Sequence, residues 1–210
     1  LEVGCATGDM LYALRCQGAH VHGVEISKHA ATIARGRGLN VTDGEVEDYA
    51  SGTDETFDLI VAYEVIEHVT SPGRFLMTLV RLVKPKGWII LDTPNLRCAH
   101  RFGNDWYGFQ TSFEHLYFFS LDTINRYAIN AGLKITYWES SIYDGSHKRP
   151  KSHHDRVLNK IDIFFFLLSK VGVARLYEII KKKESTFYPY GDGHVLQVVM
   201  QKHDIPVSLG

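Results

Sequence analysis

Short apolar runs alternate with amphipathic segments through the first half of the chain. The runs are rich in Val, Ile and Leu and end at Gly, Pro or an acidic residue, which is typical of strands buried on both faces. Between them, apolar residues recur every three or four positions, which predicts helices. Strands are expected over 1–3, 20–25, 40–42, 57–62 and 88–92, and helices over 9–17, 27–37 and 71–84. The pattern predicts an α/β fold whose mostly parallel sheet is covered on both faces.

The pattern changes after Asn95. Residues 96–119 carry aromatic residues, histidines and glycines with no clean period, which indicates a functional loop. A helix over 121–131 and strands over 133–139 and 194–201 are expected to complete the sheet.

A helical insertion, residues 141–190, is predicted between those last two strands. Its apolar stretch, 163–168, is too short to span a bilayer. We expect protein to cover it, either this domain or a second copy in a homodimer, and a membrane surface is the alternative.

A glycine turn follows the first expected strand. Residues 1–8 read Leu-Glu-Val-Gly-Cys-Ala-Thr-Gly, with Glu2 two residues before Gly4. A dinucleotide lays its pyrophosphate on a G-x-G-x-x-G turn, whereas this turn has Ala6 at its middle and is framed by the carboxylates of Glu2 and Asp9. The two acids disfavour a phosphate and suit a cationic ligand.

This turn resembles the acid-x-Gly-x-Gly-x-Gly pattern of class I S-adenosylmethionine-dependent methyltransferases. Alanine in place of the middle glycine is expected to be tolerated, because the turn is expected to have ordinary backbone angles at Ala6. The resemblance implies a Rossmann-like sheet with an antiparallel last strand, and S-adenosylmethionine as cofactor. It implies cofactor-binding positions at Glu2, Gly4, Cys5, Ala6, Thr7, Gly8, Glu25, Ile26, Glu45, Val46, Glu47, Ala62 and Tyr63.

Some of these positions have specific expected roles. Glu25 ends the second strand, where an acid hydrogen-bonds a ribose diol in sites of this type. The segment from Glu45 to Glu47 matches the family's adenine loop, although its acids are equally compatible with a solvated turn. Tyr63 is expected either to face the sulfonium through a cation–π contact or to pack in the core.

The segment Tyr63–His68 follows the fourth strand, beside the expected acceptor. His68 titrates near neutrality and is the candidate catalytic base, with a structural role as the alternative. Glu64, Glu67 and His68 form an E-x-x-E-H motif, which resembles the metal-binding motif of ubiquinone-pathway O-methyltransferases and of small-RNA 2′-O-methyltransferases. On a helical turn these side chains would share a face. With His115 they are the candidate metal ligands, and a Glu–His pair that works without metal remains open.

The aromatic loop supplies two candidates for the acceptor side of the site. Trp106 and His115 are predicted to contact the substrate, and His115 is also a candidate catalytic residue. The remaining aromatic residues of 117–119 are expected to pack against the helix that follows.

Composition narrows the class of protein further. With 23 basic and 24 acidic residues among 210, the net charge is −1, which argues against a broad nucleic-acid interface. Three cysteines, Cys5, Cys16 and Cys98, have no metal-type spacing and are expected to be reduced thiols in a cytoplasmic protein. Because the chain begins without Met inside a central strand, we expect a single domain, 1–210, that lacks an N-terminal segment.

The sequence therefore predicts an S-adenosylmethionine-dependent methyltransferase. Methylation of a hydroxyl on a small-molecule, sugar or lipid-linked acceptor is the favoured activity. The alternatives are a metal-dependent RNA 2′-O-methyltransferase, an NAD(P)-dependent oxidoreductase and a non-catalytic cofactor-binding domain.

Overall fold

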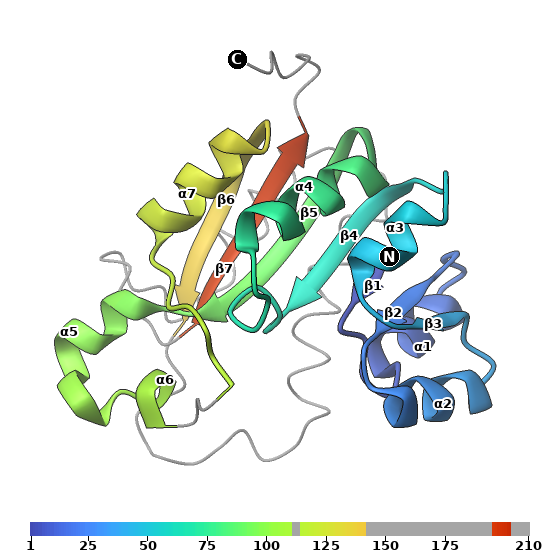
Figure 1. The fold of residues 1–210 in the computed structure, drawn as a ribbon, viewed down its shortest axis with the longest axis horizontal. Coiled ribbons are helices and arrows are strands. Elements are labelled where there is room, and N and C mark those ends of the chain that lie inside the picture. The colour runs from blue at the N-terminus through green and yellow to red at the C-terminus, as the bar shows by residue number, and fades with distance from the viewer. Residues whose placement is uncertain (111–113, 142–194, 203–210) are drawn as a thin grey trace.

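The computed structural model describes residues 1–110, 114–141 and 195–202. These residues build one seven-stranded sheet of order β3-β2-β1-β4-β5-β7-β6 (Figure 1). The first five strands are parallel, and β7 runs antiparallel to both of its neighbours. The strands are β1 (Glu2–Val3), β2 (Gly23–Glu25), β3 (Val41–Asp43), β4 (Phe57–Tyr63), β5 (Val83–Pro94), β6 (Leu133–Ser141) and β7 (Val195–Lys202). The predicted fold class is confirmed.

Helices follow the parallel strands, in most cases at the positions that the amphipathic pattern predicts. Ser27 and Ser120 accept hydrogen bonds from the first turns of α2 and α7, and Pro72 opens α4. The longer helices are α1 (Asp9–Cys16), α2 (Lys28–Gly36), α3 (Val46–Ser51), α4 (Pro72–Leu82) and α7 (Leu121–Asn130). Short helical turns fill the aromatic loop: η1 (Leu96–Cys98), α5 (Ala99–Phe102), η2 (Gly103–Asp105) and α6 (Tyr107–Gln110).

The sheet is covered on both faces, as the residues of β4 show. Ile60 and Ala62 join the core cluster built with α3, α4 and α7, whereas Leu59 and Val61 join the cluster built with α1. Figure 1 shows α4 and α7 together in front of the sheet. Alternate residues of a strand point to opposite faces, so an apolar run such as that of β4 requires both layers.

Two local predictions differ from the structure. Val46 and Glu47, expected to lie in a loop, begin α3, because Val46 and Ala50 are buried against the core and two acids lie in its first turn. Residues 85–87, which separate the predicted helix 71–84 from the predicted strand 88–92, lie within β5 as an irregularity at which Lys86 has φ 60°. The predicted insertion begins at the end of β6 and otherwise lies outside the described residues. None of the described helices is long and apolar enough to cross a membrane.

The order of the strands locates a ligand site. β1 pairs with β2 on one side and with β4 on the other, so the chain changes direction across the sheet at β1. In open α/β sheets, ligands bind at the carboxyl ends of the strands at such a switch point. The residues after β1, β2, β4 and β5 are therefore the ones that can build a site.

Candidate active site

The glycine turn after β1 has a left-handed backbone at three alternate positions. Gly4, Ala6 and Gly8 have φ values of 72°, 47° and 78°. The expectation of ordinary backbone angles at Ala6 is therefore wrong, since an L-residue in this region carries a strain of about 1 kcal/mol. At Gly8 a side chain has no room, because an added Cβ would lie 2.4 Å from Leu39 Cδ1.

The carboxylate of Glu25 fixes this turn. Its Oε2 accepts a hydrogen bond from the Ala6 N–H at 2.7 Å, and its Oε1 accepts one from the Ser27 N–H at 2.8 Å. Glu25 is 8% exposed, whereas Ile26 next to it is 69% exposed. A carboxylate has lone pairs beyond these two bonds, so Glu25 can accept further bonds from a ligand's hydroxyls beside the apolar surface of Ile26.

Two of the predicted cofactor positions turn their side chains away from the site. Cys5 lies in the cluster under α1 and α2, and burial raises the pKa of its thiol to about 12, with Glu2 and Glu25 contributing. Val46 is buried with the residues of α4. These two residues can meet a ligand only through their backbone.

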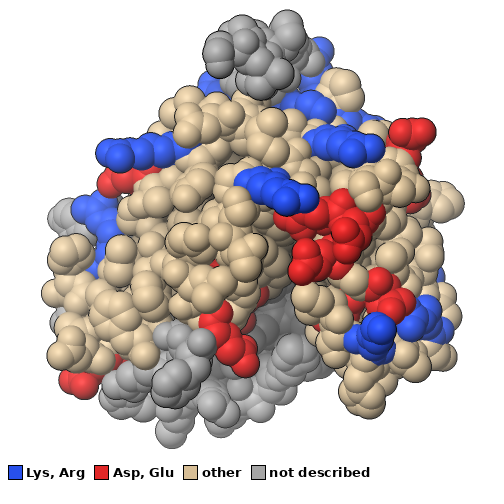
Figure 2. Space-filling view, in the orientation of Figure 1, with Lys and Arg blue, Asp and Glu red and all other residues tan. Residues whose placement is uncertain are grey.

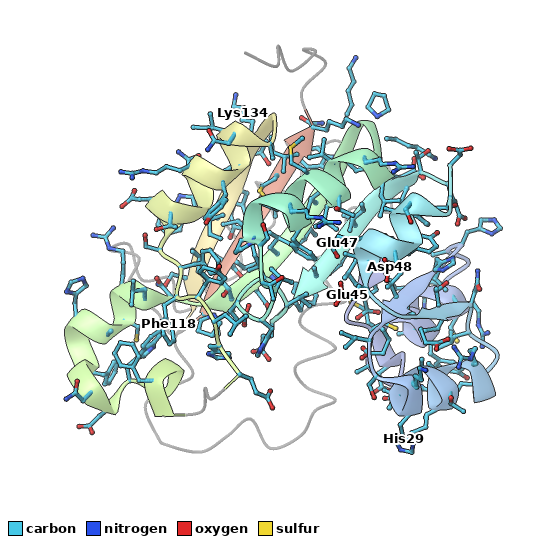
Figure 3. The ribbon with its side chains drawn as sticks, in the orientation of Figure 1. His29, Glu45, Glu47, Asp48, Phe118 and Lys134 are labelled. Carbon is cyan, nitrogen blue, oxygen red and sulfur yellow. The ribbon has the colours of Figure 1, made fainter. Side chains whose placement is uncertain are left out.

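Acidic side chains surround the start of α3. Glu45 is exposed and precedes the helix, and Glu47 and Asp48 lie in its first turn (Figure 3). Figure 2 shows acidic atoms gathered in the same part of this face. This negative surface flanks the glycine turn on the β3 side.

The segment after β4 is not a helix. Glu64 is exposed with φ 53°, and its N–H donates to Asp92, at 2.8 Å to Oδ1 and 3.1 Å to the carbonyl. The prediction that Glu64 shares a helical face with Glu67 and His68 is therefore wrong. Tyr63 ends β4 and packs with Met10 and Leu14 of α1, and burial keeps its pKa well above the usual range.

Hydrogen bonds join this segment to residues 114–117. The Glu67 carbonyl accepts from the N–H groups of Leu116 and Tyr117, at 2.8 and 3.2 Å. His68 Nδ1 lies 3.0 Å from the Glu114 carbonyl oxygen. A carbonyl can only accept, so Nδ1 carries the proton and Nε2 of the neutral ring keeps its lone pair.

The hydrogen bonds to residues 114–117 bring Glu67, His68 and His115 together. Each offers a ligand atom, and these atoms lie within 4.8 Å of one another. The two histidine rings meet edge to face, with centroids 4.8 Å apart. The structure thus unites three of the four candidate metal ligands and leaves Glu64 outside the group.

Burial dominates the electrostatics of this group. Glu67 is 1% exposed, and within the described residues neither of its carboxylate oxygens has a hydrogen bond of ordinary geometry. Burial raises the pKa of Glu67 to about 8, with Asp92 and Glu64 adding to the rise. Burial and then the neighbouring His68 lower the pKa of His115, so its ring is neutral at pH 7.

Trp106 is fully buried, which corrects its assignment as a substrate contact. Its ring packs edge to face against Phe109 and Phe118, with centroids 4.8 and 5.7 Å away, and also lies against Gly108. Phe118 lies with α5 and α6 in Figure 3. Trp106 therefore packs inside the aromatic loop. His115, whose ring centroid lies 6.2 Å from that of Phe118, remains beside the site.

Two residues that the sequence interpretation did not select also shape the site. Asp92 ends the apolar run of β5 and holds the segment after β4, a role that an acid at a strand end can signal. Arg37 follows α2 and pairs with Asp9 at 2.6 Å. Because the Arg37 guanidinium pairs with it, the Asp9 carboxylate attracts a cationic ligand less than an unpaired carboxylate would.

Comparisons with known proteins agree with this geometry. A family model described as "Methyltransferase domain" matches residues 1–137. A ubiquinone biosynthesis O-methyltransferase of Thiobacillus denitrificans is 35% identical over 101 residues, which are 45% of this chain and 44% of that protein. The chain thus matches less than half the length of this curated relative.

Solved structures share the fold. A protein from Thermotoga maritima, described as a S-adenosylmethionine-dependent methyltransferase and possible histamine N-methyltransferase, has a TM-score of 0.59 at 20% identity; the match covers 96% of this chain and 80% of that one. The plantazolicin methyltransferase BpumL, solved with a monoazolic desmethylPZN analogue and S-adenosylhomocysteine, has a TM-score of 0.60 at 16% identity; the match covers 96% of this chain and 74% of that one. At these identities the likeness establishes the fold.

Proposed function

The chain belongs to the methyltransferase domain family, and from this premise we propose that it transfers a methyl group from S-adenosylmethionine to a hydroxyl group. The acceptor is a small molecule, a sugar or a lipid-linked intermediate. One observation carries the proposal: the turn fixed by Glu25 and the group of Glu67, His68 and His115 lie at the same edge of the sheet. An added Cβ at Gly4 would lie 2.7 Å from Val65 Cγ2, so the two halves touch.

The residues present fit the cofactor. Glu25 is placed to accept hydrogen bonds from a ribose diol, and the exposed side chain of Ile26 offers an apolar surface for the adenosine. Glu45 and the backbone around Val46 would hold the adenine, and the backbone of Gly4, Ala6, Thr7 and Gly8 would hold the methionine part. The bound cofactor supplies a methyl group on a cationic sulfur.

His68 is the proposed base for the acceptor hydroxyl. Its Nδ1 is engaged with the Glu114 carbonyl, so Nε2 is the nitrogen that can take a proton. His115, neutral and in contact with the His68 ring, is proposed to orient the acceptor. The reaction also requires the oxygen and the methyl group to be held in line and away from water.

Calorimetry and a transfer assay test this proposal. We expect the protein to bind S-adenosylhomocysteine, to show no binding of NAD, and to transfer labelled methyl groups to hydroxylated small molecules. Transfer to RNA ends instead would favour the RNA 2′-O-methyltransferase. Binding without transfer to either class of acceptor would favour a non-catalytic domain, and binding of NAD alone would contradict the assignment.

A divalent metal is the second candidate function of this site. The convergence of Glu67, His68 and His115 favours it, and so does the Nδ1–H bond of His68, because metal-bound histidines usually donate their other N–H to a carbonyl or carboxylate. A bound cation would acidify an acceptor hydroxyl. Two imidazoles and one carboxylate suit Mn²⁺ or Zn²⁺ better than Mg²⁺, which prefers oxygen ligands.

Metal binding is expected to depend on the three grouped residues and not on the whole sequence motif. In the metal-freed protein, His115→Ala should weaken Mn²⁺ binding, measured by calorimetry, by about 10-fold or more. Glu64→Ala is the matched control and should leave Mn²⁺ binding unchanged, because Glu64 lies outside the group. Full transfer activity in chelator, with no Mn²⁺ binding by the native protein, would contradict the metal and leave His68 as the base.

A further inference from the structure

The glycine turn is held from a second side, by a residue that follows α2. Arg37 Nη1 donates to the Thr7 carbonyl at 2.8 Å and to Asp9 Oδ1 at 2.6 Å. Thr7 lies between Ala6 and Gly8, the two left-handed residues at the centre of the turn. Arg37 thus holds the peptide carbonyl that follows the strained Ala6 and precedes Gly8.

The position of Arg37 is itself well defined. Its backbone N–H closes the end of α2 through bonds to the carbonyls of Ile33 and Ala34, at 3.2 and 3.1 Å. Its guanidinium lies over the ring of Tyr12 on α1, 5.0 Å from the ring centroid. A planar guanidinium that both stacks on a ring and donates in two directions is restricted in orientation.

Arg37 and Glu25 act on the turn in opposite senses. Glu25 accepts from the Ala6 N–H, and Arg37 donates to the Thr7 carbonyl, so one N–H and one carbonyl of the Ala6–Gly8 segment are held by side chains from outside the turn. Glu25 ends β2 and Arg37 follows α2, so one β–α unit supplies both. The left-handed conformation of Ala6 costs free energy, and such strain persists when the surroundings over-determine it.

We propose that Arg37 is a positioning residue for the methyl donor: it holds the glycine turn in its binding conformation before the ligand arrives. This inference rests on the proposed cofactor site. Asp9 also contributes, because its carboxylate accepts a hydrogen bond from the same guanidinium. It lies in the first turn of α1, where a negative charge interacts favourably with the helix dipole. A preformed turn spares the ligand the free energy of ordering it, so the contribution appears in affinity.

The contribution to folding stability is expected to be small. The side chains of Arg37 and Asp9 are 32% and 41% exposed. Ion pairs with this exposure are screened by water and contribute little to stability. Variants of Arg37 should therefore lose affinity for the methyl donor with little loss of folding stability. A purely structural ion pair would change affinity only in step with stability.

Calorimetry with S-adenosylhomocysteine on the full chain tests the inference. Arg37→Ala should weaken binding by about 5- to 20-fold while the unfolding midpoint stays near that of the native protein. Arg37→Lys should recover part of the affinity, because an ammonium keeps the charge and the N–H donors but cannot stack on the Tyr12 ring as a planar guanidinium does.

Arg15→Ala is the matched control. Arg15 also lies over Tyr12, at 5.4 Å, and donates to the Arg37 carbonyl at 3.2 Å, but it has no described bond to the turn. It should leave the affinity unchanged. If Arg37→Ala binds as tightly as the native protein, or loses affinity only in step with its stability, the inference is overturned. If the native protein does not bind S-adenosylhomocysteine, the proposed function fails first.

Discussion

Replacing Glu25 with alanine is expected to weaken binding of S-adenosylhomocysteine by about 100-fold, which is close to 3 kcal/mol. The change removes the charged acceptor for the ribose hydroxyls. It also leaves the N–H groups of Ala6 and Ser27 without the acceptor they have in the native protein. Because Ala6 is left-handed, the turn is expected to relax away from its binding conformation, and calorimetry would record both losses together.

Two further variants separate these effects. Glu25→Gln keeps one oxygen acceptor and should retain part of the affinity. Asp58→Ala removes a carboxylate that is 87% exposed and pairs with Lys84, so it should leave the affinity unchanged. If Glu25→Ala binds S-adenosylhomocysteine as tightly as Asp58→Ala does, the ribose does not meet Glu25 and the cofactor site is misplaced.

The strands, most of the helices and the residues at the carboxyl edge of the sheet could be predicted from the sequence because they depend on local patterns. The apolar run of β4 and the capping residues Ser27 and Ser120 act within a few positions of themselves. The same holds for Glu25, whose distance along the chain from Gly8 places it at the neighbouring strand end. Such features determine which residues reach the carboxyl edge of the sheet.

The errors concern properties that depend on backbone conformation or on distant packing. Ala6 and Glu64 are left-handed because Glu25 and Asp92 hold their N–H groups, and neither partner is near in sequence. The assumption of a helical turn grouped Glu64 with Glu67, which the bond to Asp92 prevents. Trp106 has the side chain of a ligand contact but is covered by aromatic residues up to 12 positions away.

The group of Glu67, His68 and His115 depends on a contact between two segments that are far apart in the sequence. His115 reaches His68 only because the Glu67 carbonyl receives two N–H groups of the returning chain. Glu67 and His68 are neighbours in the sequence motif, whereas His115 joins them only through the hydrogen bonds between the two segments. Burying Glu67 costs free energy of folding, and the buried carboxyl is also a candidate metal ligand.

In the presence of chelator, Glu67→Gln is expected to be more stable than the native protein, and the gap is expected to widen with pH. Burial raises the pKa of Glu67 to about 8, so the folded state keeps its proton while the unfolded chain, with an ordinary value near 4.5, has lost it. Between these values the native state binds more protons, and its stability therefore falls as pH rises. The glutamine side chain does not titrate in this range, so it makes no contribution of this kind to the pH dependence.

Urea unfolding of both proteins at pH 5, 6, 7 and 8 measures this difference. The free energy of unfolding of Glu67→Gln minus that of the native protein should grow by about 1.4 kcal/mol per pH unit across most of this range, and level off above pH 8. An amide that fits the site poorly would lower every value by the same amount and leave the slope intact. A difference that stays constant with pH would show that Glu67 ionises normally in the folded protein, and that its carboxylate is not held in an apolar environment beside the two histidines.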